Sequence, residues 1–448
     1  MRLIVALLVD FVLWLGIDIF SSGSYTSHPR RDSNKTLPLC VVNDDGLSCS
    51  YNGLCVRSNC NTQETHCLCD PGWKGMYCEA LDLVPVANGS GLQDLLTQNR
   101  TSTWGGSVLF DQGVYHMFFS ELAHHCGIHR WISHSVVSHA VSAGPEDNWK
   151  FHKTKTLLPI FSHEPIVTRD PSTGELGLFV SHYPHGSAAD DNDSTCHCVD
   201  GSTSSALEKR CIHEPGLGHN KTMYTYFTTA HQPTGPWSPL QSLEHETPEG
   251  QKRFDLNFAP LILPTTNRSL SLLAWTRWDI WTATDWKNPH TYVRQGPAPN
   301  FSNPHAQWEG EDPSLWRDSK GRFHILSHNG PRGIGGPEGD CGRHLFSATG
   351  QAGSWLAAPL PLGGCAFPRV NVSFVDGSSR TFYRRERPHL IFGPHGRPAA
   401  LSTSVIDSPV GPGVPGFQPP QRDASYTLVQ ATHTGRHFDS TASEKDSC

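Results

Sequence analysis

The chain has 448 residues, which is enough for one large domain and one small one. Its formal charge of -7 leaves no basic footprint, so nucleic acid is not an expected partner. Charged residues make up only 17% of the chain, whereas Gly (41) and Pro (34) are plentiful, a balance that favours turn-rich β structure over helices.

The N-terminus predicts a secretory signal peptide over residues 1–23. Arg2 provides a short positive start, residues 3–20 are mostly apolar, and small residues follow at 21–24. The alternative is an uncleaved segment that anchors the protein in a membrane, because this apolar stretch is just long enough to span one. Asp10 and Asp18 disfavour the anchor by about 2.5–3.5 kcal/mol each if they lie centrally. We therefore expect a secreted, extracellular protein, with a membrane-anchored one as the alternative.

Two further features indicate the secretory pathway. The chain has 14 cysteines, an even number that is high for a reduced cytosolic protein. It also has Asn-x-Ser/Thr sequons, which predict an N-glycosylated surface. The sequons begin at Asn34, Asn88, Asn99, Asn192, Asn220, Asn267, Asn300 and Asn371.

Residues 38–80 form a cysteine-rich segment that is too short to bury much core, so disulfides must hold it together. It contains "CSYNGLC" and "CLCDPGWKGMYC", and this spacing resembles an EGF-like module. The resemblance implies the disulfide pairs Cys40–Cys55, Cys49–Cys67 and Cys69–Cys78. Cys60 is left over, with a cysteine of the main domain as its candidate partner. The acidic residues that precede the first cysteine of calcium-binding EGF modules are missing from "NKTLPLC", so we expect no calcium here and a spacer or adhesion role.

After a short polar linker at residues 81–100, one hairpin pattern recurs. Each copy has a small or polar pair, often followed by Pro, and then two apolar strands separated by a turn rich in Asp, Gly, Ser or Pro. The copies span residues 104–122, 163–183, 258–278, 311–329 and 386–405. A third strand and a turn recur after all but the last copy, at 138–149, 226–237, 281–292 and 344–355. This repetition predicts an all-β fold, a five-bladed β-propeller over residues 100–410, in preference to a β-sandwich.

The remaining segments are an insertion and a tail. Residues 184–222 form a polar insertion whose "CHC" motif, with Cys211 and His213, could bind zinc, although disulfides are favoured. Residues 411–448 form a Pro/Gly-rich polar tail, expected to be extended or disordered, with 425–431 as a candidate strand that closes the ring. Cys341 is the first candidate partner of Cys126. The sequence alone leaves open the pairing of Cys60, Cys126, Cys196, Cys198, Cys211, Cys341, Cys365 and Cys448.

The predicted propeller resembles the five-bladed glycoside hydrolases of family 43 and its relatives. The resemblance covers residues 100–410 and rests on the repeat pattern and on the acid-Pro openings of the hairpins. The chain also resembles a group of EGF-plus-propeller proteins of no secure activity, through Trp104–Ser107, His125–Gly127, Glu311–Pro313 and Arg385–Pro388. The family 43 resemblance implies hydrolysis of glycosidic bonds.

The residues that open the first strand of each predicted blade should gather at one mouth of a central channel. These openings contribute four carboxylates, which we predict as the catalytic set: Glu164, Asp312, Glu386 and the neighbouring Glu311. Clustered carboxylates push their pKa values apart, so that one can act as an acid and another as a base, as glycosidic hydrolysis requires. Substrate contacts are predicted from Arg387, which suits a uronic acid, and from Trp104, Glu121 and His125.

The resemblance does not transfer residue by residue. In family 43 a base Asp, a modulating Asp and an acid Glu come from blades one, two and three. Here blade one opens with Gly105-Gly106 and blade three with Phe258-Ala259, so only Glu164 matches in type. The leading interpretation is a secreted glycosidase that acts on a polysaccharide or glycan without a cofactor or metal. The alternative is a non-catalytic extracellular protein that binds a glycan or mediates adhesion.

Overall fold

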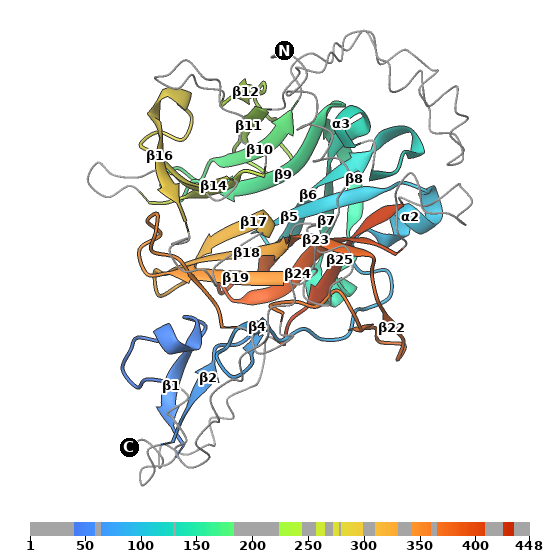
Figure 1. Ribbon diagram of the computed structural model, residues 1–448. Helices are drawn as coiled ribbons and strands as arrows, with labels where there is room; N and C mark the ends of the chain where they lie inside the picture. The colour runs from blue at the N-terminus through green and yellow to red at the C-terminus, as the bar shows by residue number, and fades with distance from the viewer. Residues whose placement is uncertain are drawn as a thin grey trace, which may run out of the picture. The chain divides into compact units, whose positions relative to one another are not determined.

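The computed structural model describes residues 40–58, 64–128, 131–182, 224–243, 257–264, 272–276, 279–298, 310–329, 342–359, 365–407 and 424–433 (Figure 1). The predicted signal peptide, the insertion at 184–222 and most of the predicted tail lie outside these residues. Within these stretches, no helix is both long enough and apolar enough to cross a membrane.

Antiparallel sheets dominate the described residues in a propeller arrangement, and four of these sheets have four strands each. The first contains β5 (Thr103–Asp111), β6 (Val114–Leu122), β7 (Ser135–Ser142) and β8 (His152–Leu158), and the second β9 (Ser162–Arg169), β10 (Leu176–His182), β11 (Tyr224–Ala230) and β12 (Gln241–Ser242). The third contains β13 (Ala259–Ile262), β14 (Leu272–Thr276), β15 (Asp279–Ala283) and β16 (Tyr292–Pro297), and the fourth β17 (Gly310–Arg317), β18 (Phe323–Asn329), β19 (Gly342–Ser347) and β20 (Leu356–Ala357). These sheets coincide with the first four sequence repeats.

The fifth predicted repeat forms a sheet of three strands, β23 (Arg384–Phe392), β24 (Pro398–Ile406) and β25 (Ser425–Ala431). β21 (Val372–Ser373) and β22 (Ser379–Arg380) form a separate two-stranded sheet. The short helices between the strands are η2 (Ala123–His125), α3 (Trp131–His134), η4 (Gly144–Asp147) and η7 (Pro289–Thr291). The described residues therefore contain four four-stranded blades and a three-stranded sheet at the fifth repeat, so a fifth blade stays a prediction.

The first strands of these sheets contact one another in cyclic order: β5 with β9, β9 with β13, β13 with β17, β17 with β23, and β23 with β5. Apolar side chains fill the spaces between neighbouring sheets. Phe118 and Val137 of the first sheet pack against Val167 and Leu178 of the second. Burial of these faces needs a neighbouring sheet on each side, which explains why the hairpin recurs along the chain.

The first strands bend near their N-terminal ends. In β5, β9, β17 and β23 the pairing register shifts, as expected for a β-bulge. The residues at these bends have positive φ angles: Gly105 (68°), Glu164 (60°), Asp312 (55°) and Arg387 (53°). Asn257, two residues before the start of β13, also has a positive φ, of 61°. Bulges change the direction of a side chain and are frequent beside active sites, so these bends are central to the site.

The segment predicted as a polar linker is instead part of the packed structure. Leu83 forms a bridge to Thr432, the amide of Val84 donates to the carbonyl of Ala431 at 2.9 Å, and the amide of Leu92 donates to the carbonyl of Thr427 at 2.8 Å. Residues 83–92 therefore run along β25, and α2 (Gln93–Asn99) follows them and also contacts β25. The error arose because a polar composition was taken as a sign of a free connection.

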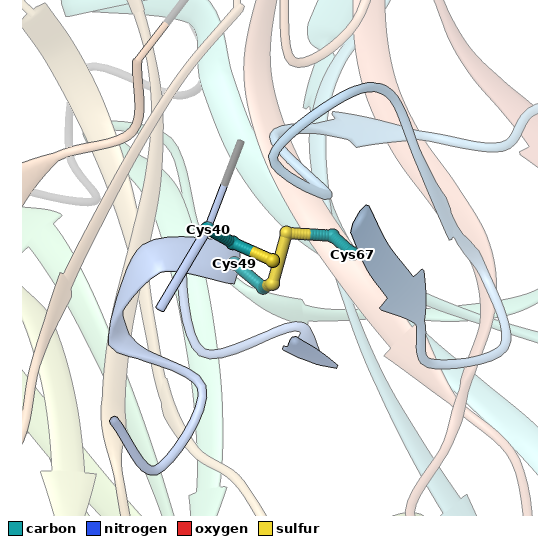
Figure 2. A group of neighbouring side chains, drawn as sticks. All are labelled: Cys40, Cys49 and Cys67. Carbon is teal, nitrogen blue, oxygen red and sulfur yellow. A yellow bond between two sulfur atoms is a disulfide. The ribbon is translucent and has the colours of Figure 1, made fainter. Parts of the chain in front are cut away.

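The cysteine-rich segment contains η1 (Leu47–Cys49), β1 (Gly53–Arg57), β2 (Thr65–Cys69), β3 (Trp73–Lys74) and β4 (Ala80–Leu81). Its disulfides join Cys40 to Cys55, Cys49 to Cys67 and Cys69 to Cys78, which are the pairs that the EGF resemblance implied. Figure 2 shows Cys40 beside the Cys49–Cys67 disulfide. Cys126 and Cys365 are also disulfide-bonded. Cys341, the predicted partner of Cys126, lies outside the described residues.

The cysteine-rich segment also packs against the β17–β20 sheet. The rings of Trp73 and Trp316 stack with their centroids 6.5 Å apart, and Trp73 lies 4.9 Å from the ring of His344. Lys320 forms an ion pair of 2.9 Å with Asp70. This segment is therefore continuous with the propeller core and is not a detached spacer.

Candidate active site

The residues at the bends come together around the first strands. We call Gly105, Glu164, Asn257, Asp312 and Arg387 the bend ring. All of its members line one pocket with a cavity volume of about 30 Å³. Four of these residues are followed in the chain by a glycine or a proline: Gly106, Pro165, Pro313 and Pro388. These following residues have small side chains and therefore fill little of the pocket. The cavity holds one or two groups of the size of water, which excludes a whole sugar ring from this part of the channel.

Arg387 lies between the other members of the bend ring. Its Nη2 atom contacts the carboxylate of Glu164, lies 2.6 Å from Oδ1 of Asp312, and donates a hydrogen bond of 2.8 Å to Oδ1 of Asn257. The side chains of Arg387, Glu164 and Asp312 are 9%, 11% and 7% exposed, so solvent does not screen these ion pairs. Arg387 thus neutralises part of the predicted catalytic set. Its predicted contact with a substrate carboxylate would compete with acids that already bind it.

The charge state of the bend ring follows from burial. Desolvation raises the pKa of Glu164 and that of Asp312 to about 7, against the lowering effect of the Arg387 guanidinium. One guanidinium offsets one carboxylate. We therefore expect the Glu164–Asp312 pair to keep about one proton up to near-neutral pH, because two ionised carboxylates beside a single cation would leave a buried charge uncompensated.

A second group of side chains adjoins Asp312. His328, near the end of β18, places Nδ1 3.4 Å from Oδ2 of Asp312 and Nε2 4.0 Å from Oε1 of Glu386. Glu386 is 20% exposed and lies 3.7 Å from Nε of Arg384. Burial raises the pKa of Glu386 and lowers that of His328, so the imidazole is neutral at pH 7. Glu386 is more exposed than Asp312 and Glu164, the two acids that Arg387 contacts.

The two remaining predicted acids, Glu311 and Glu121, differ in how their neighbours bind them. Glu311 is exposed, and its Oε1 accepts a hydrogen bond of 3.4 Å from Nδ2 of Asn257. Glu121 is bound by its neighbours, since it accepts a hydrogen bond of 2.5 Å from Oγ of Ser138 and pairs with Nζ of Lys153 at 2.6 Å. Glu311 is therefore free to meet a ligand at the surface, whereas Glu121 would first have to leave an ion pair.

The predicted aromatic and histidine contacts are less favourable. Trp104 is only 4% exposed and packs in an apolar cluster with Leu122, Cys126 and Ile406, so it presents no open ring face to a sugar. His125 is exposed and has a left-handed backbone, with φ of 57°, in η2. Its side chain makes no contact with the bend ring that the described residues record.

Sequence reasoning placed blade three in the wrong register. It took Phe258-Ala259 as the opening pair, whereas Asn257 supplies the side chain that meets Arg387. The prolines had served as alignment marks, but Pro260 follows Asn257 by three residues, whereas Pro165, Pro313 and Pro388 directly follow the residue at the bend. Blade three therefore contributes an amide, and the acid Glu expected from family 43 remains absent at this position.

Sequence reasoning also missed His328, His163 and Arg384. His328 pairs with Glu311 across β17 and β18, so a hairpin register drawn from the sequence could have placed it beside the acids. His163 contacts Oε1 of Glu164 at 3.5 Å through Nε2, and its Nδ1 lies 2.7 Å from Oγ of Ser135. It adjoins Glu164 in the sequence, but no pattern distinguished it from the other histidines.

One group of side chains could hold a metal ion. Ligand atoms of Asp312, His328 and Glu386 all lie within 4.8 Å of one another, and carboxylate oxygens with an imidazole nitrogen suit a divalent cation. The nearby guanidinium of Arg387, 2.6 Å from Asp312, opposes a second cation there. A further cluster, Cys40, Cys49 and Cys67, consists of disulfide-bonded cysteines, whose sulfurs are not thiolate ligands. The expectation that the protein uses no metal stays a prediction.

Comparisons with known proteins find similarity in structure only. No protein-family model matches the sequence, and no curated protein matches it. Among solved structures, a GH62 hydrolase in complex with xylotriose is 10% identical, with a TM-score of 0.48 over 79% of this chain and 98% of that one. The catalytic domain of a GH62 α-L-arabinofuranosidase from Coprinopsis cinerea is 11% identical, with a TM-score of 0.46 over 78% and 96%.

A GH43 β-1,3-galactosidase with galactodeoxynojirimycin is 12% identical, with a TM-score of 0.40 over 74% of this chain and 90% of that one. These structural neighbours are glycoside hydrolases of the two families that their names give. Their identities and TM-scores are too low to assign a shared activity, so the functional argument rests on the geometry of this site.

Proposed function

We propose that this protein is a glycoside hydrolase that cleaves a glycosidic bond in a polysaccharide or glycan. The observation that carries the proposal is the placement of Asp312 and Glu386 on either side of His328, with oxygen atoms within 4.8 Å of each other. Glycosidases use two carboxyl groups about 5–5.5 Å apart for retention of configuration or about 6.5–9.5 Å apart for inversion. The spacing here favours the shorter class.

In this proposal Glu386 is the proton donor. It is reachable from solvent, and burial raises its pKa, which favours the protonated form that a general acid requires. Its proton passes to the glycosidic oxygen as the bond from that oxygen to the anomeric carbon breaks. Water then supplies the hydroxyl group that ends on the sugar and the proton that restores Glu386.

Asp312 is the ionised partner of Glu386. Arg387 contacts the carboxylates of both Asp312 and Glu164, so that one of the two acids is ionised and the other keeps the shared proton; this scheme requires the ionised one to be Asp312. The negative charge of Asp312, buried behind Glu386, stabilises through space the positive charge that develops at the anomeric carbon as the glycosidic bond breaks. Glu311, exposed at the edge, is available for substrate hydroxyl groups.

A non-catalytic glycan-binding protein is the second candidate function. The contact of Arg387 with both Glu164 and Asp312 favours it, because ion-paired acids that fill the channel are poor acids and bases. In this alternative, Glu311, Glu386 and Arg384 serve only as hydrogen-bonding groups for a sugar.

The first test is hydrolysis of a broad panel of polysaccharides by wild type, Glu386→Gln and Asp312→Asn. Removal of a general acid costs about 10²–10⁴-fold in rate, so Glu386→Gln should release reducing ends at least about 100-fold more slowly. Glu146→Gln, at an exposed position in η4, is the matched control and should be fully active. If the wild type cleaves nothing but binds one glycan in calorimetry, the second candidate function replaces the first.

We also propose the finer architecture that the sequence predicted. The β23–β25 sheet is the fifth blade, and residues 83–92 occupy the place of its fourth strand; their hydrogen bonds to β25 support this. The cysteine-rich segment is an EGF-like module, supported by its three disulfides. Those disulfides also support secretion, with N-glycans at exposed sequons such as Asn99 and Asn371. Mass spectrometry of protein secreted from eukaryotic cells tests these modifications.

A further inference from the structure

The bend ring leaves no room for a sugar ring, so a bound sugar must lie in front of it, at the mouth of the channel. The mouth is the end at which the first strands begin, because the bends lie two or three residues after the starts of β5, β9, β17 and β23. Trp104 lies at this end but is buried. Two other aromatic side chains at the mouth, Trp131 and Tyr383, are only half-buried and present part of their surface to solvent.

Trp131 lies next to the predicted acids. It begins α3, in the connection from β6 to β7, and α3 contacts β9. The centroid of its ring is 5.0 Å from that of His163, and Nε2 of His163 lies 3.5 Å from Oε1 of Glu164 in the bend ring. His163 is only 2% exposed, so the indole covers it, and the accessible part of the indole faces away from it.

Tyr383 reaches the same place from the other end of the chain. It directly precedes β23, and its amide donates a hydrogen bond of 2.7 Å to the carbonyl of Ile406. Tyr383 and Trp131 both pack against one group of buried side chains, which we call the mouth cluster: Trp104, Leu122, Cys126, Ile128 and Ile406. Each member of the mouth cluster is 7% exposed or less, and Cys126 is disulfide-bonded. The two half-buried rings therefore share a rigid support.

Half-exposed aromatic rings on a rigid support suit a sugar. A pyranose ring whose C–H groups lie together on one face is apolar there and can pack on indole or phenol, while its hydroxyl groups stay at the edge. Ligand sites generally combine such apolar surfaces with a few polar groups. Arg384 and Glu386, which follow Tyr383 in the chain, are 39% and 20% exposed and supply a donor and an acceptor for hydroxyl groups.

We propose that Trp131 and Tyr383 form a sugar-binding subsite in front of the bend ring, for a pyranose with a continuous C–H face. The subsite lies where the first and fifth sequence repeats meet, since α3 follows β6 and Tyr383 precedes β23. This inference rests on the proposed function and specifies which side chains hold the sugar beside the acids. Binding at the two rings requires no cleavage, so it can be measured independently of activity.

The experiment observes Trp131 directly, in the full-length protein labelled with 5-fluorotryptophan. Fluorine-19 NMR resolves the tryptophans as separate signals, and Trp131→Phe identifies the Trp131 signal by its loss. The probes are the methyl β-glycosides of xylose, glucose and galactose at millimolar concentrations. We expect at least one probe to shift the Trp131 signal in a saturable way. If none of them shifts it, the proposal is overturned.

Trp237 provides the matched control. It is also half-buried, but it lies in the connection from β11 to β12 and packs against Phe118, with their ring centroids 5.5 Å apart. Its signal should not move with any probe, and Trp237→Ala should bind the probe as the wild type does. A probe that shifts the Trp131 and Trp237 signals equally binds aromatic surface without selectivity and overturns the proposal.

Substitutions measure what each ring contributes. Trp131→Ala and Tyr383→Ala should each raise the Kd of the probe about fivefold to tenfold, the range expected for loss of one aromatic contact. Trp131→Phe and Tyr383→Phe retain a ring and should raise it by less than about threefold, and they remain informative if an alanine variant does not fold. An unchanged Kd in both folded alanine variants overturns the proposal.

Failure of the subsite and failure of the proposed function give different results. If a probe shifts the Trp131 signal but the wild type cleaves no polysaccharide, the subsite stands and the hydrolase proposal fails. If the wild type cleaves a polysaccharide whose KM is unchanged in Trp131→Ala and Tyr383→Ala, the hydrolase proposal stands and the subsite is overturned.

Discussion

Replacement of Arg387 by methionine tests the charge balance of the bend ring. The substitution removes the cation that contacts Glu164 and Asp312 and retains most of the side-chain volume. Both acids are buried, so solvent cannot take over from the guanidinium in stabilising their negative charges. The variant should therefore remain folded at acidic pH, where both acids are protonated, and lose stability as the pH rises.

The magnitude follows from proton linkage. In the unfolded chain both acids lose their protons near pH 4, whereas the folded pair of the wild type keeps about one proton up to near pH 7. Without the guanidinium the folded variant keeps about two. A group whose pKa is raised on folding gives full stability below its unfolded pKa and loses it as pH rises, by about 1.4 kcal/mol per pH unit for each such proton. Between pH 5 and pH 7 the variant should fall behind the wild type by about 3 kcal/mol.

Equilibrium unfolding in denaturant at pH 5, 6 and 7 provides the measurement. Arg294→Met is the control, because Arg294 pairs with Asp279 at 2.8 Å but is 46% exposed, and such a pair contributes about 1 kcal/mol or less. Its effect should be the same at each pH. Equal losses at pH 5 and pH 7 for Arg387→Met would refute the argument, because they would show that the guanidinium acts through packing and not through charge.

Two further predictions concern the contacts that hold the chain together. Trp73→Ala should lower the free energy of unfolding by about 3–5 kcal/mol, because Trp73 is 7% exposed and packs against Trp316 and His344. Thermal unfolding measures this loss, and a loss under about 1 kcal/mol would mean that the packing is weak in solution. Gly91→Ala should expose residues 83–92 to limited proteolysis, because Gly91 has φ of 73° and an added Cβ would overlap the carbonyl oxygen of Thr427. Gly113→Ala is its control, with φ of 86° and open space around the site, and equal cleavage in both variants would contradict the prediction.

The repeated sheets were predictable because each one is local in sequence. A hairpin needs only its two strands and its turn, so the alternation of apolar runs with Gly, Pro and Asp records it directly. The disulfide pairs of the cysteine-rich segment followed from spacing for the same reason. The linker prediction failed because the partner of residues 83–92 is β25, at the opposite end of the chain.

The membership of the site was predictable only in part. Glu164, Asp312, Glu386 and Arg387 were identified because each opens a repeat, and the structure brings them into one cluster. Their pairing was not predictable, because the distance between acids on different sheets depends on the bend angle of each first strand. Asn257 shows this limit: Pro260 was used to align the repeats but follows the bend by three residues, so the predicted alignment of this strand was shifted and Asn257 was missed.

The packing of residues 83–92 on β25 has a consequence for the order in which the protein is made. The hydroxyl of Ser90 donates a hydrogen bond to the carbonyl of Val429, a contact that joins positions 339 residues apart. During synthesis, the earlier sheets can therefore form long before the N-terminal segment finds its partner strand. Until Arg387 emerges on β23, Glu164 and Asp312 have no cation between them and must remain hydrated. Completion of the ring and neutralisation of the site are thus late events, and a chain that stops before β25 would have its acids in place but an open ring around them.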